Sequence, residues 1–158
     1  MRKVIINTTP IIALSEIGEL SLLKSLYGEV VIPKAVFEEI KTEPGFTEVR
    51  ECDWIHVENI KDDSKRGLFQ SRLHKGEVEV MMLAMETNAD LVVIDDALAR
   101  KTAKYYEMTI TGTLGILIKA KEKGLVDSVD KLMNRLISNG LYVSEDVRLA
   151  VLNEAGEA

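Results

Sequence analysis

The sequence predicts an α/β protein, a three-layer helix-sheet-helix sandwich around a central parallel sheet. Short apolar runs rich in β-branched residues recur along the chain, and segments with helical spacing of apolar residues lie between them. Strands that alternate with helices are typical of a parallel sheet. The run Leu91–Ile94 is apolar at every position, as expected for a strand that is buried on both faces.

Length and composition favour a single domain. A chain of 158 residues with a net charge of −6 is long enough for a sizeable core. We expect one domain over residues 1–158, with a helical extension over about 127–158. No apolar run approaches the ~18 residues that span a membrane, and no export signal is evident. Because Cys52 is the single cysteine, we expect no internal disulfide or cysteine-based zinc site and a cytoplasmic setting.

Proline and glycine set the expected boundaries in the N-terminal half. Pro10 suits the first turn of a helix with Thr9 as its N-cap, and Pro33 opens another helix. Pro44 must end that helix, so residues 42–53 are predicted to form a loop. We expect strands at residues 3–7, 30–32 and 54–57, the last at a sheet edge, and helices at residues 10–17, 20–26, 33–41 and 62–73.

The C-terminal half continues the alternation. Gly76 precedes a strongly apolar helix, and Gly124 ends a later one. Asp127 and Ser144 are the expected N-caps of the two last helices. We expect strands at residues 91–94 and 108–110, and helices at residues 77–87, 97–105, 114–123, 128–138 and 145–154.

Two adjacent acids follow the buried strand at residues 91–94. Asp95 and Asp96 therefore lie at the carboxyl end of a strand, where ligands of open α/β sheets bind. Neighbouring carboxylates repel unless a cation, a shared proton or water separates them. One interpretation is a divalent metal site. The other is an Asp that N-caps the helix at residue 97 beside a solvated neighbour.

Helical spacing separates the acids of the helix at residues 77–87. Glu77 points along the apolar stripe, whereas Glu79 and Glu86 share a face with solvent. A glutamate in a first turn is also favoured by the helix dipole. The sequence leaves both a site role and this purely structural role open for Glu77.

Two further candidates precede these acids. Glu39 lies at the flank of the apolar stripe of the helix after Pro33, either pointing inward or at the rim. Asn7 ends the first strand and offers an uncharged amide oxygen. In a parallel sheet with short connections, Asn7 and Glu39 could converge with Glu77 and the Asp95–Asp96 pair on one cleft. Such carboxylate sites bind cations and drive phosphodiester hydrolysis.

Residues 97–123 contain a local excess of positive charge, although the whole chain is acidic. Arg100 and Lys104 lie directly after the acidic pair. Such a stripe is enough to guide a nucleic-acid backbone, but it is also a common solvated helix face. The hydroxyls of Thr8 and Thr113 would lie at the same rim.

Several blocks of the sequence resemble the PIN-domain family, in the DUF3368-type prokaryotic branch related to VapC toxins. The similar segments are Ile6–Leu14 (INTTPIIAL), Val31–Pro33 with Glu39, His74–Glu79 (HKGEVE), Ile94–Asp96 with Ala99 and Arg100, Thr111–Leu117 (TGTLGIL), and residues 139–144 before the last helix. These blocks occur in the expected order over most of residues 4–118.

The resemblance implies a Mg²⁺- or Mn²⁺-dependent single-strand endoribonuclease, homodimeric and silenced by a small antitoxin protein. Glu39, Glu77 and Asp95 match the acids of the family, with Asp96 the adjacent acid. Asn7 replaces the usual first-strand Asp, and the loss of one charge should weaken metal binding. We therefore expect Glu39, Glu77, Asp95 and Asp96 to be catalytic, and Glu77, Asp95, Asp96 and Asn7 to hold metal. Thr8, Thr113, Arg100 and Lys104 would contact RNA.

Two alternatives to a nuclease remain. A catalytically silent PIN-like module that binds RNA or protein is consistent with Asn7 and the acidic charge. A phosphoacceptor receiver domain also gathers acids at strand ends, but there the acid pair follows the first strand and a lysine follows a late one. Here the pair follows a later strand. The last helix would pack on its own domain or on a second copy.

Overall fold

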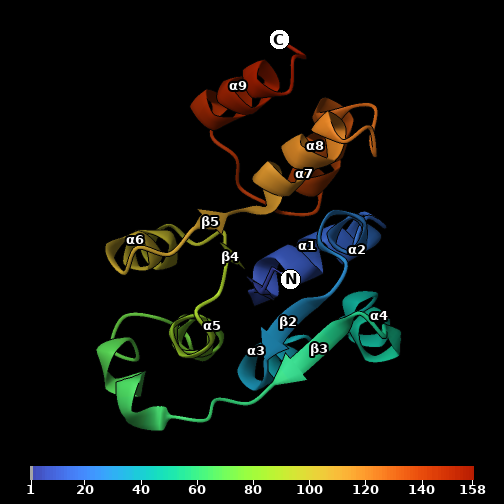
Figure 1. The fold of residues 1–158 in the computed structure, drawn as a ribbon. Coiled ribbons are helices and arrows are strands. Elements are labelled where there is room, and N and C mark those ends of the chain that lie inside the picture. The colour runs from blue at the N-terminus through green and yellow to red at the C-terminus, as the bar shows by residue number, and fades with distance from the viewer. Residues whose placement is uncertain (1) are drawn as a thin grey trace.

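The computed structural model describes residues 2–158 and contains one five-stranded sheet (Figure 1). The strands are β1 (Val4–Ile6), β2 (Val30–Pro33), β3 (Ile55–Glu58), β4 (Leu91–Val93) and β5 (Ile110–Thr111). They are ordered β3-β2-β1-β4-β5, and every pair is parallel. The predicted α/β fold with a central parallel sheet is confirmed, and β3 is an edge strand as predicted.

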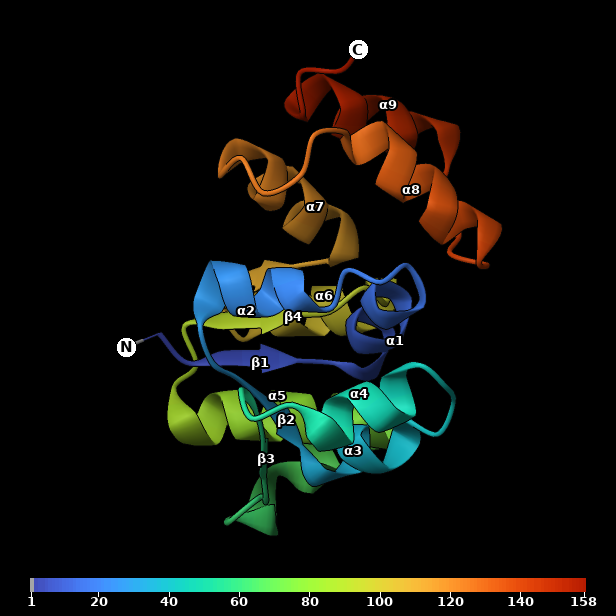
Figure 2. The same cartoon turned by 90° about the vertical axis from the view of Figure 1, so that its right-hand side faces the viewer.

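Helices cover both sides of this sheet. They are α1 (Thr8–Glu16), α2 (Ser21–Tyr27), α3 (Lys34–Glu39), α4 (Gly45–Glu51), the 3-10 helix η1 (Asp63–Leu68), α5 (Lys75–Thr87), α6 (Ala97–Tyr105), α7 (Thr113–Glu122), α8 (Val129–Ser138) and α9 (Glu145–Glu154). In Figure 2, α2 and α5 lie on opposite sides of β1. Helices α8 and α9 pack on α7 and lie together at one end of the molecule in both views (Figures 1 and 2). Within residues 2–158, no helix is both long and apolar enough to cross a membrane.

The core follows the buried strands. All three residues of β1 and all three of β4 are buried, with Ile5 paired to Val92. Ile94 is also fully buried, so the whole apolar run at residues 91–94 is shielded as predicted. Burying apolar surface on both faces of these strands is the main source of stability here. It also fixes where the first polar residue after each strand emerges.

Residues 45–51 form helix α4, so the loop predicted for residues 42–53 is wrong. Pro44 lies at the N-cap position and begins this helix instead of only ending the previous one. The side chain of Glu43 accepts hydrogen bonds from the backbone and hydroxyl of Thr47. Arg50 packs over the rings of Phe37 and Phe46. These contacts stabilise a seven-residue helix whose sequence has little apolar periodicity.

Two helix N-caps and the length of one helix differ from the predicted ones. Helix α1 begins at Thr8, so Asn7 and not Thr9 is at the N-cap position. Helix α8 is capped by the Ser128 hydroxyl, which accepts from the backbone of Lys131, and not by Asp127. The region predicted as a helix over residues 62–73 contains the shorter η1. The predicted cap of α9 by Ser144 is confirmed.

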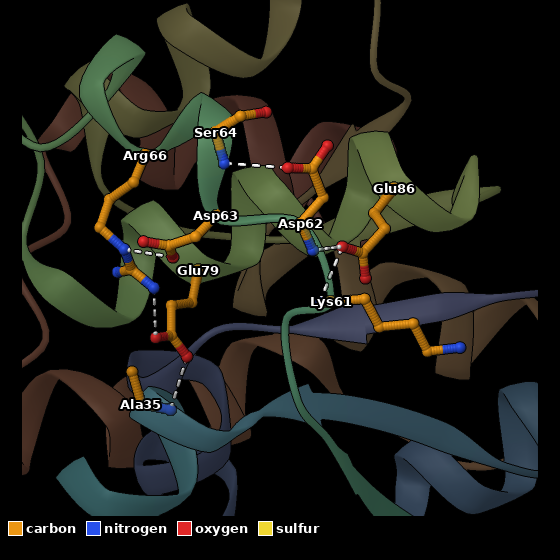
Figure 3. A network of polar contacts seen from close by, with 8 residues as sticks. All are labelled: Ala35, Lys61, Asp62, Asp63, Ser64, Arg66, Glu79 and Glu86. Atoms are coloured by element: carbon orange, nitrogen blue, oxygen red, sulfur yellow. Dashed lines mark hydrogen bonds and ion pairs between the residues drawn. The ribbon is translucent and has the colours of Figure 1, made fainter.

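Glu79 is buried, contrary to the prediction that it faces solvent. Its carboxylate accepts from the backbone N–H of Ala35 at 3.0 Å and from Arg66 Nη2 at 3.2 Å (Figure 3). Arg66 also donates to Asp63 at 2.8 Å. Residues 76–84 of α5 are all buried, because α3 and η1 pack on this helix in addition to β1 and β2, so this part of α5 has no solvent-facing side. We call Ala35, Asp63, Arg66 and Glu79 the Glu79 network.

Candidate functional site

A large cleft opens at the carboxyl ends of β4 and β5, with a volume of about 960 Å³. Its acidic residues are Glu77 at the start of α5, the pair Asp95–Asp96 after β4, and Glu154 at the end of α9. Helices α6, α7 and α9 and the segment at Leu141 and Tyr142 contribute further lining residues. The buried strand β4 positions Asp95 and Asp96 at this edge of the sheet, as the sequence predicts, and the first turn of α5 positions Glu77 there.

Asp95 is held rigidly by the start of α7. Its Oδ1 accepts from the backbone N–H of Thr113 at 2.7 Å, and its Oδ2 accepts from the Thr113 hydroxyl at 2.6 Å. A Cβ atom at Gly112 would lie 2.7 Å from Asp95 Oδ1 and 3.0 Å from Arg100 Nη1. Glycine at position 112 therefore allows the carboxylate to approach the helix terminus, where the dipole favours negative charge.

Asp96 caps helix α6. Its Oδ2 accepts from the backbone N–H of Ala99 at 3.0 Å, and the residue is exposed. The interpretation of this position as an N-cap is therefore confirmed. Only Oδ2 makes this capping bond, so Oδ1 of Asp96 stays available to another ligand.

Glu77 is the buried acid of the cleft, with 8% of its surface exposed. Its Oε1 accepts from the backbone N–H of His74 at 3.1 Å. Burial raises the pKa of Glu77, the His74 hydrogen bond lowers it, and the charges of Asp96 and Glu39 raise it further. Three predicted site acids thus act on one another electrostatically. The predicted inward orientation of Glu77 is confirmed.

Glu39 connects three elements next to Glu77. It ends α3, and its carboxylate accepts from the Thr8 hydroxyl at 2.6 Å and from the backbone N–H of Gly76 at 3.1 Å. A Cβ atom at position 76 would overlap this carboxylate. Gly76 therefore lets Glu39 bind the N-terminus of α5.

Asn7 carries an unsatisfied polar atom in the protein interior. Only 3% of its surface is exposed, and its backbone N–H donates to Val93 at 2.9 Å. Its side-chain Oδ1 is buried without a hydrogen-bond partner among residues 2–158. An orphan of this kind costs roughly 1–3 kcal/mol and calls for a ligand, an ion or a water molecule.

The donors of this region fit a hard divalent cation in type. Carboxylate oxygens and an orphan amide oxygen are the ligands that Mg²⁺ and Mn²⁺ prefer. Within residues 2–158, no group of three His, Cys, Asp or Glu side chains is placed so that it could hold a metal ion. Glu39, Asp95 and Asp96 instead turn toward backbone N–H groups at the starts of α5, α7 and α6.

Cations of α6 line the same cleft. Arg100, Lys101 and Lys104 contribute to its wall, and Arg100 Nη1 is fixed by a 3.0 Å hydrogen bond to the carbonyl of Ile94. The predicted sites Arg100 and Lys104 are thus beside the acids. Lys101 belongs to the basic stripe predicted over residues 97–123, and it lines the cleft as well.

Thr8 and Thr113 are not the free hydroxyls at the rim of the cleft that the sequence suggested. The hydroxyls of Thr8 and Thr113 donate to Glu39 and Asp95, and Thr113 is fully buried. The structure thus shows them positioning carboxylates, and their contact with RNA stays a prediction. Tyr142 and α9 also line the cleft. No local pattern in the sequence places this C-terminal segment beside Asp95.

Comparison with known proteins agrees with this architecture. The model of the family DUF3368, described as a PIN domain, matches residues 3–157. Neither a curated protein nor a solved structure matches the chain. PIN domains are generally nucleases and typically use divalent metals. With almost its whole length matched, the chain belongs to the PIN-domain family.

Proposed function

We propose that this protein is a metal-dependent endoribonuclease that cleaves single-stranded RNA. The observation that carries the proposal is the cleft itself. Glu77, Asp95 and Asp96 line this cleft together with Arg100, Lys101 and Lys104. Carboxylates suit a cation and the basic side chains suit phosphate, so the two together match a phosphodiester substrate.

To hold Mg²⁺ or Mn²⁺, the side chains of Glu77, Asp95 and Asp96 would have to turn from the backbone N–H groups that they bind in this structure, with the orphan oxygen of Asn7 as a neutral donor. When bound, the cation would activate water and neutralise charge that develops on the phosphate. Glu39 fixes the start of α5, and thereby Glu77, through Gly76. Thr113 orients Asp95 in the same way.

The basic face of α6 would orient the RNA. Arg100 is fixed by the Ile94 carbonyl, whereas Lys104 is exposed and free to follow the backbone. Contacts of this kind carry no base information, and each is weakened by salt. Such phosphate contacts would give affinity for an RNA strand but would not determine the sequence that is cleaved.

The direct test is cleavage of a single-stranded RNA in Mn²⁺ by the wild type and by Glu77→Gln. Glu77→Gln keeps the hydrogen-bond acceptor for His74 and removes the charge. We expect time-dependent cleavage by the wild type and a loss of at least about 100-fold in the variant. Equal cleavage by both proteins would show that the activity does not depend on Glu77 and would overturn this site assignment.

Asp96 is a candidate replacement for the carboxylate missing at Asn7. Its second oxygen and its repulsive effect on Glu77 favour this role. We expect Asp96→Asn to weaken Mn²⁺ binding. Asparagine can still accept from Ala99, so the cap of α6 is retained. Unchanged Mn²⁺ affinity in Asp96→Asn would rule this compensation out.

A catalytically silent RNA- or protein-binding module is the second candidate. It is favoured by the uncharged Asn7 and by the structural hydrogen bonds that Glu39, Asp95 and Asp96 already make. In that case the wild type would bind RNA without cleaving it, whether or not Mn²⁺ is present. The cleavage assay separates the two candidates.

We further propose a homodimer and a small antitoxin protein as partners, with the enzyme as the toxin of the pair. Helix α9 buries Val151 and Leu152 on its own chain, whereas Val147 and Leu149 are about half exposed. An apolar residue pair of this kind suits a protein contact. Sedimentation of the purified chain tests the dimer, and growth arrest that a co-expressed neighbouring reading frame relieves tests the toxin role.

A further inference from the structure

A second groove lies beside the cleft, between α6 and the segment formed by η1 and the residues up to Leu73. Its volume is about 420 Å³, within the range of roughly 300–1,000 Å³ that is typical of ligand sites. It contains none of the acids described above, and the proposed reaction does not use it.

Helix α6 forms one wall of both cavities. Leu98, Lys101 and Tyr105 are spaced by three and four residues, so they share one face, and all three line the groove. Arg100, Lys101 and Lys104 line the acidic cleft. Because Lys101 lines both, the groove continues from the cleft around this side chain.

The groove presents an aromatic ring to solvent. Tyr105 is 80% exposed, yet its ring packs edge-to-face on Tyr106 with centroids 5.0 Å apart. Tyr106 packs in turn on the buried Phe69 at 5.4 Å. An exposed tyrosine without such support would be expected to move freely. Here the contacts among Phe69, Tyr106 and Tyr105 hold the Tyr105 ring in place with one face open to solvent, and a base can stack on such a fixed face.

Charge selects the kind of ligand. Arg72 and Lys101 are among the lining residues, and none of the lining residues is acidic. Leu68 and Leu98 supply exposed apolar surface beside the ring. A flat apolar ring attached to an anionic backbone, that is, a nucleotide, matches this combination of aromatic, apolar and cationic groups.

The opposite wall is fixed to the fold. Arg66 lies in η1 just before Leu68 and the C-cap residue Phe69, and it joins Glu79 and Asp63 in the Glu79 network (Figure 3). The backbone N–H of Phe69 donates to Arg66, and that of Leu73 donates to Phe69. The groove is therefore preformed, which reduces the entropy lost when a ligand binds.

We propose that this groove binds one unstacked base of the RNA strand, stacked on Tyr105, while the backbone passes Lys101 into the acidic cleft. The proposal rests on the proposed function and adds a base-binding subsite to it. Asp96 and Tyr105 lie at opposite ends of α6, and the nine residues of this helix span about 13 Å. The base therefore belongs to a nucleotide near the cleaved phosphate but not at it.

The test measures dissociation constants by fluorescence anisotropy in EDTA, so that no strand is cleaved. The probes are a short labelled oligouridine and an abasic strand of the same length. Tyr105→Ala should weaken binding of oligouridine by about 5- to 150-fold, the cost of removing a stacking aromatic ring. It should change binding of the abasic strand by less than about twofold, because no base is present to stack.

Two control variants accompany Tyr105→Ala. Tyr105→Phe keeps the ring and should retain most of the affinity for oligouridine, whereas Leu125→Ala removes an exposed side chain that lines neither cavity. Since Tyr105 is mostly exposed, thermal unfolding of all three variants should match the wild type.

Each other outcome overturns the assignment. Equal losses for both strands, or no loss for either, would show that no base stacks on Tyr105. A changed oligomeric state of Tyr105→Ala with unchanged RNA affinity would make the groove a contact between copies of this chain. If the wild type itself binds neither strand in EDTA, the base subsite is refuted, whereas the proposed function is judged separately by the cleavage assay in Mn²⁺.

Discussion

Individual residues of the site combine structural and chemical roles. Asp95, Asp96 and Glu39 each accept a backbone N–H at a helix start, and these bonds hold them near Glu77. Asn7 is different, because its side-chain oxygen is buried and has no partner among residues 2–158. A negative charge added at position 7 should therefore have a large effect on metal binding.

Replacing Asn7 by aspartate should strengthen metal binding. The added carboxylate supplies a negative charge where the orphan Oδ1 of Asn7 lies and occupies nearly the same volume. We expect Mn²⁺ affinity to rise by roughly 10-fold and the protein without metal to lose stability through repulsion. Calorimetric titration in Mn²⁺ checks this, with Asn139→Asp as an exposed control. Equal affinity in the wild type and Asn7→Asp would place Asn7 outside the metal site.

The pKa of Glu77 gives a prediction with a definite sign. Because burial raises this pKa in the folded state, ionised Glu77 opposes folding, and its cost grows as pH rises through the folded-state pKa. In EDTA at neutral pH, Glu77→Gln should therefore unfold about 2–4 °C above the wild type. The difference should vanish below the ordinary glutamate pKa of 4.5. A lower melting temperature for Glu77→Gln in EDTA would contradict this account.

At the scale of elements, sequence patterns predicted the helices and strands that local chemistry determines. Helix α6 has the predicted bounds because Asp96 caps it and apolar spacing defines its buried face. Helix α4 was missed, since its stability comes from Glu43 and from Arg50 on two rings and not from periodicity. The pairing of Asp95 with Thr113 joins residues 18 positions apart and leaves no mark in either segment.

Gly76 and Gly112 leave room for site acids at the starts of two helices. Glu39 binds the start of α5 beside Gly76, and Asp95 binds the start of α7 beside Gly112. A methyl group at position 76 would overlap the carboxylate of Glu39. We expect Gly76→Ala to displace Glu39 and to lower the free energy of unfolding by roughly 1–3 kcal/mol. Denaturant unfolding measures this. Gly67→Ala is the matched control, because a Cβ atom there meets nothing within 4 Å. Equal stability of the two variants would show that Glu39 does not depend on position 76.

At the scale of the whole molecule, α9 and the segment before it complete the cleft, and both depend on how α8 packs. Glu157 joins them to the rest, because its carboxylate accepts from Lys121 at 2.8 Å and from the backbone of Val129 and Asp130 at the start of α8. Sequence patterns gave the bounds of α8 and α9 but not their packing on α7, since an amphipathic face does not identify what covers it. The cleft therefore had one wall that the sequence could not predict.

Glu157 should make the C-terminal packing acid-sensitive. The hydrogen bond from Lys121 and the backbone bonds at α8 lower its pKa from 4.5 to about 2. Its contribution is then full above pH 4.5 and is lost as pH falls toward 2. At pH 7, Glu157→Gln should melt about 2–4 °C below the wild type. The gap should close on acidification, and a gap independent of pH would exclude this carboxylate as the cause.

The central claim is that acids from separate parts of the chain form one cation site. A double-mutant cycle tests it most directly, with Mn²⁺ affinity measured by calorimetry for the wild type, Glu77→Gln, Asp95→Asn and the double variant. One shared site predicts that each single change removes most of the affinity and that the second change adds little. Small and additive losses, or Mn²⁺ binding that persists in the double variant, would contradict the account.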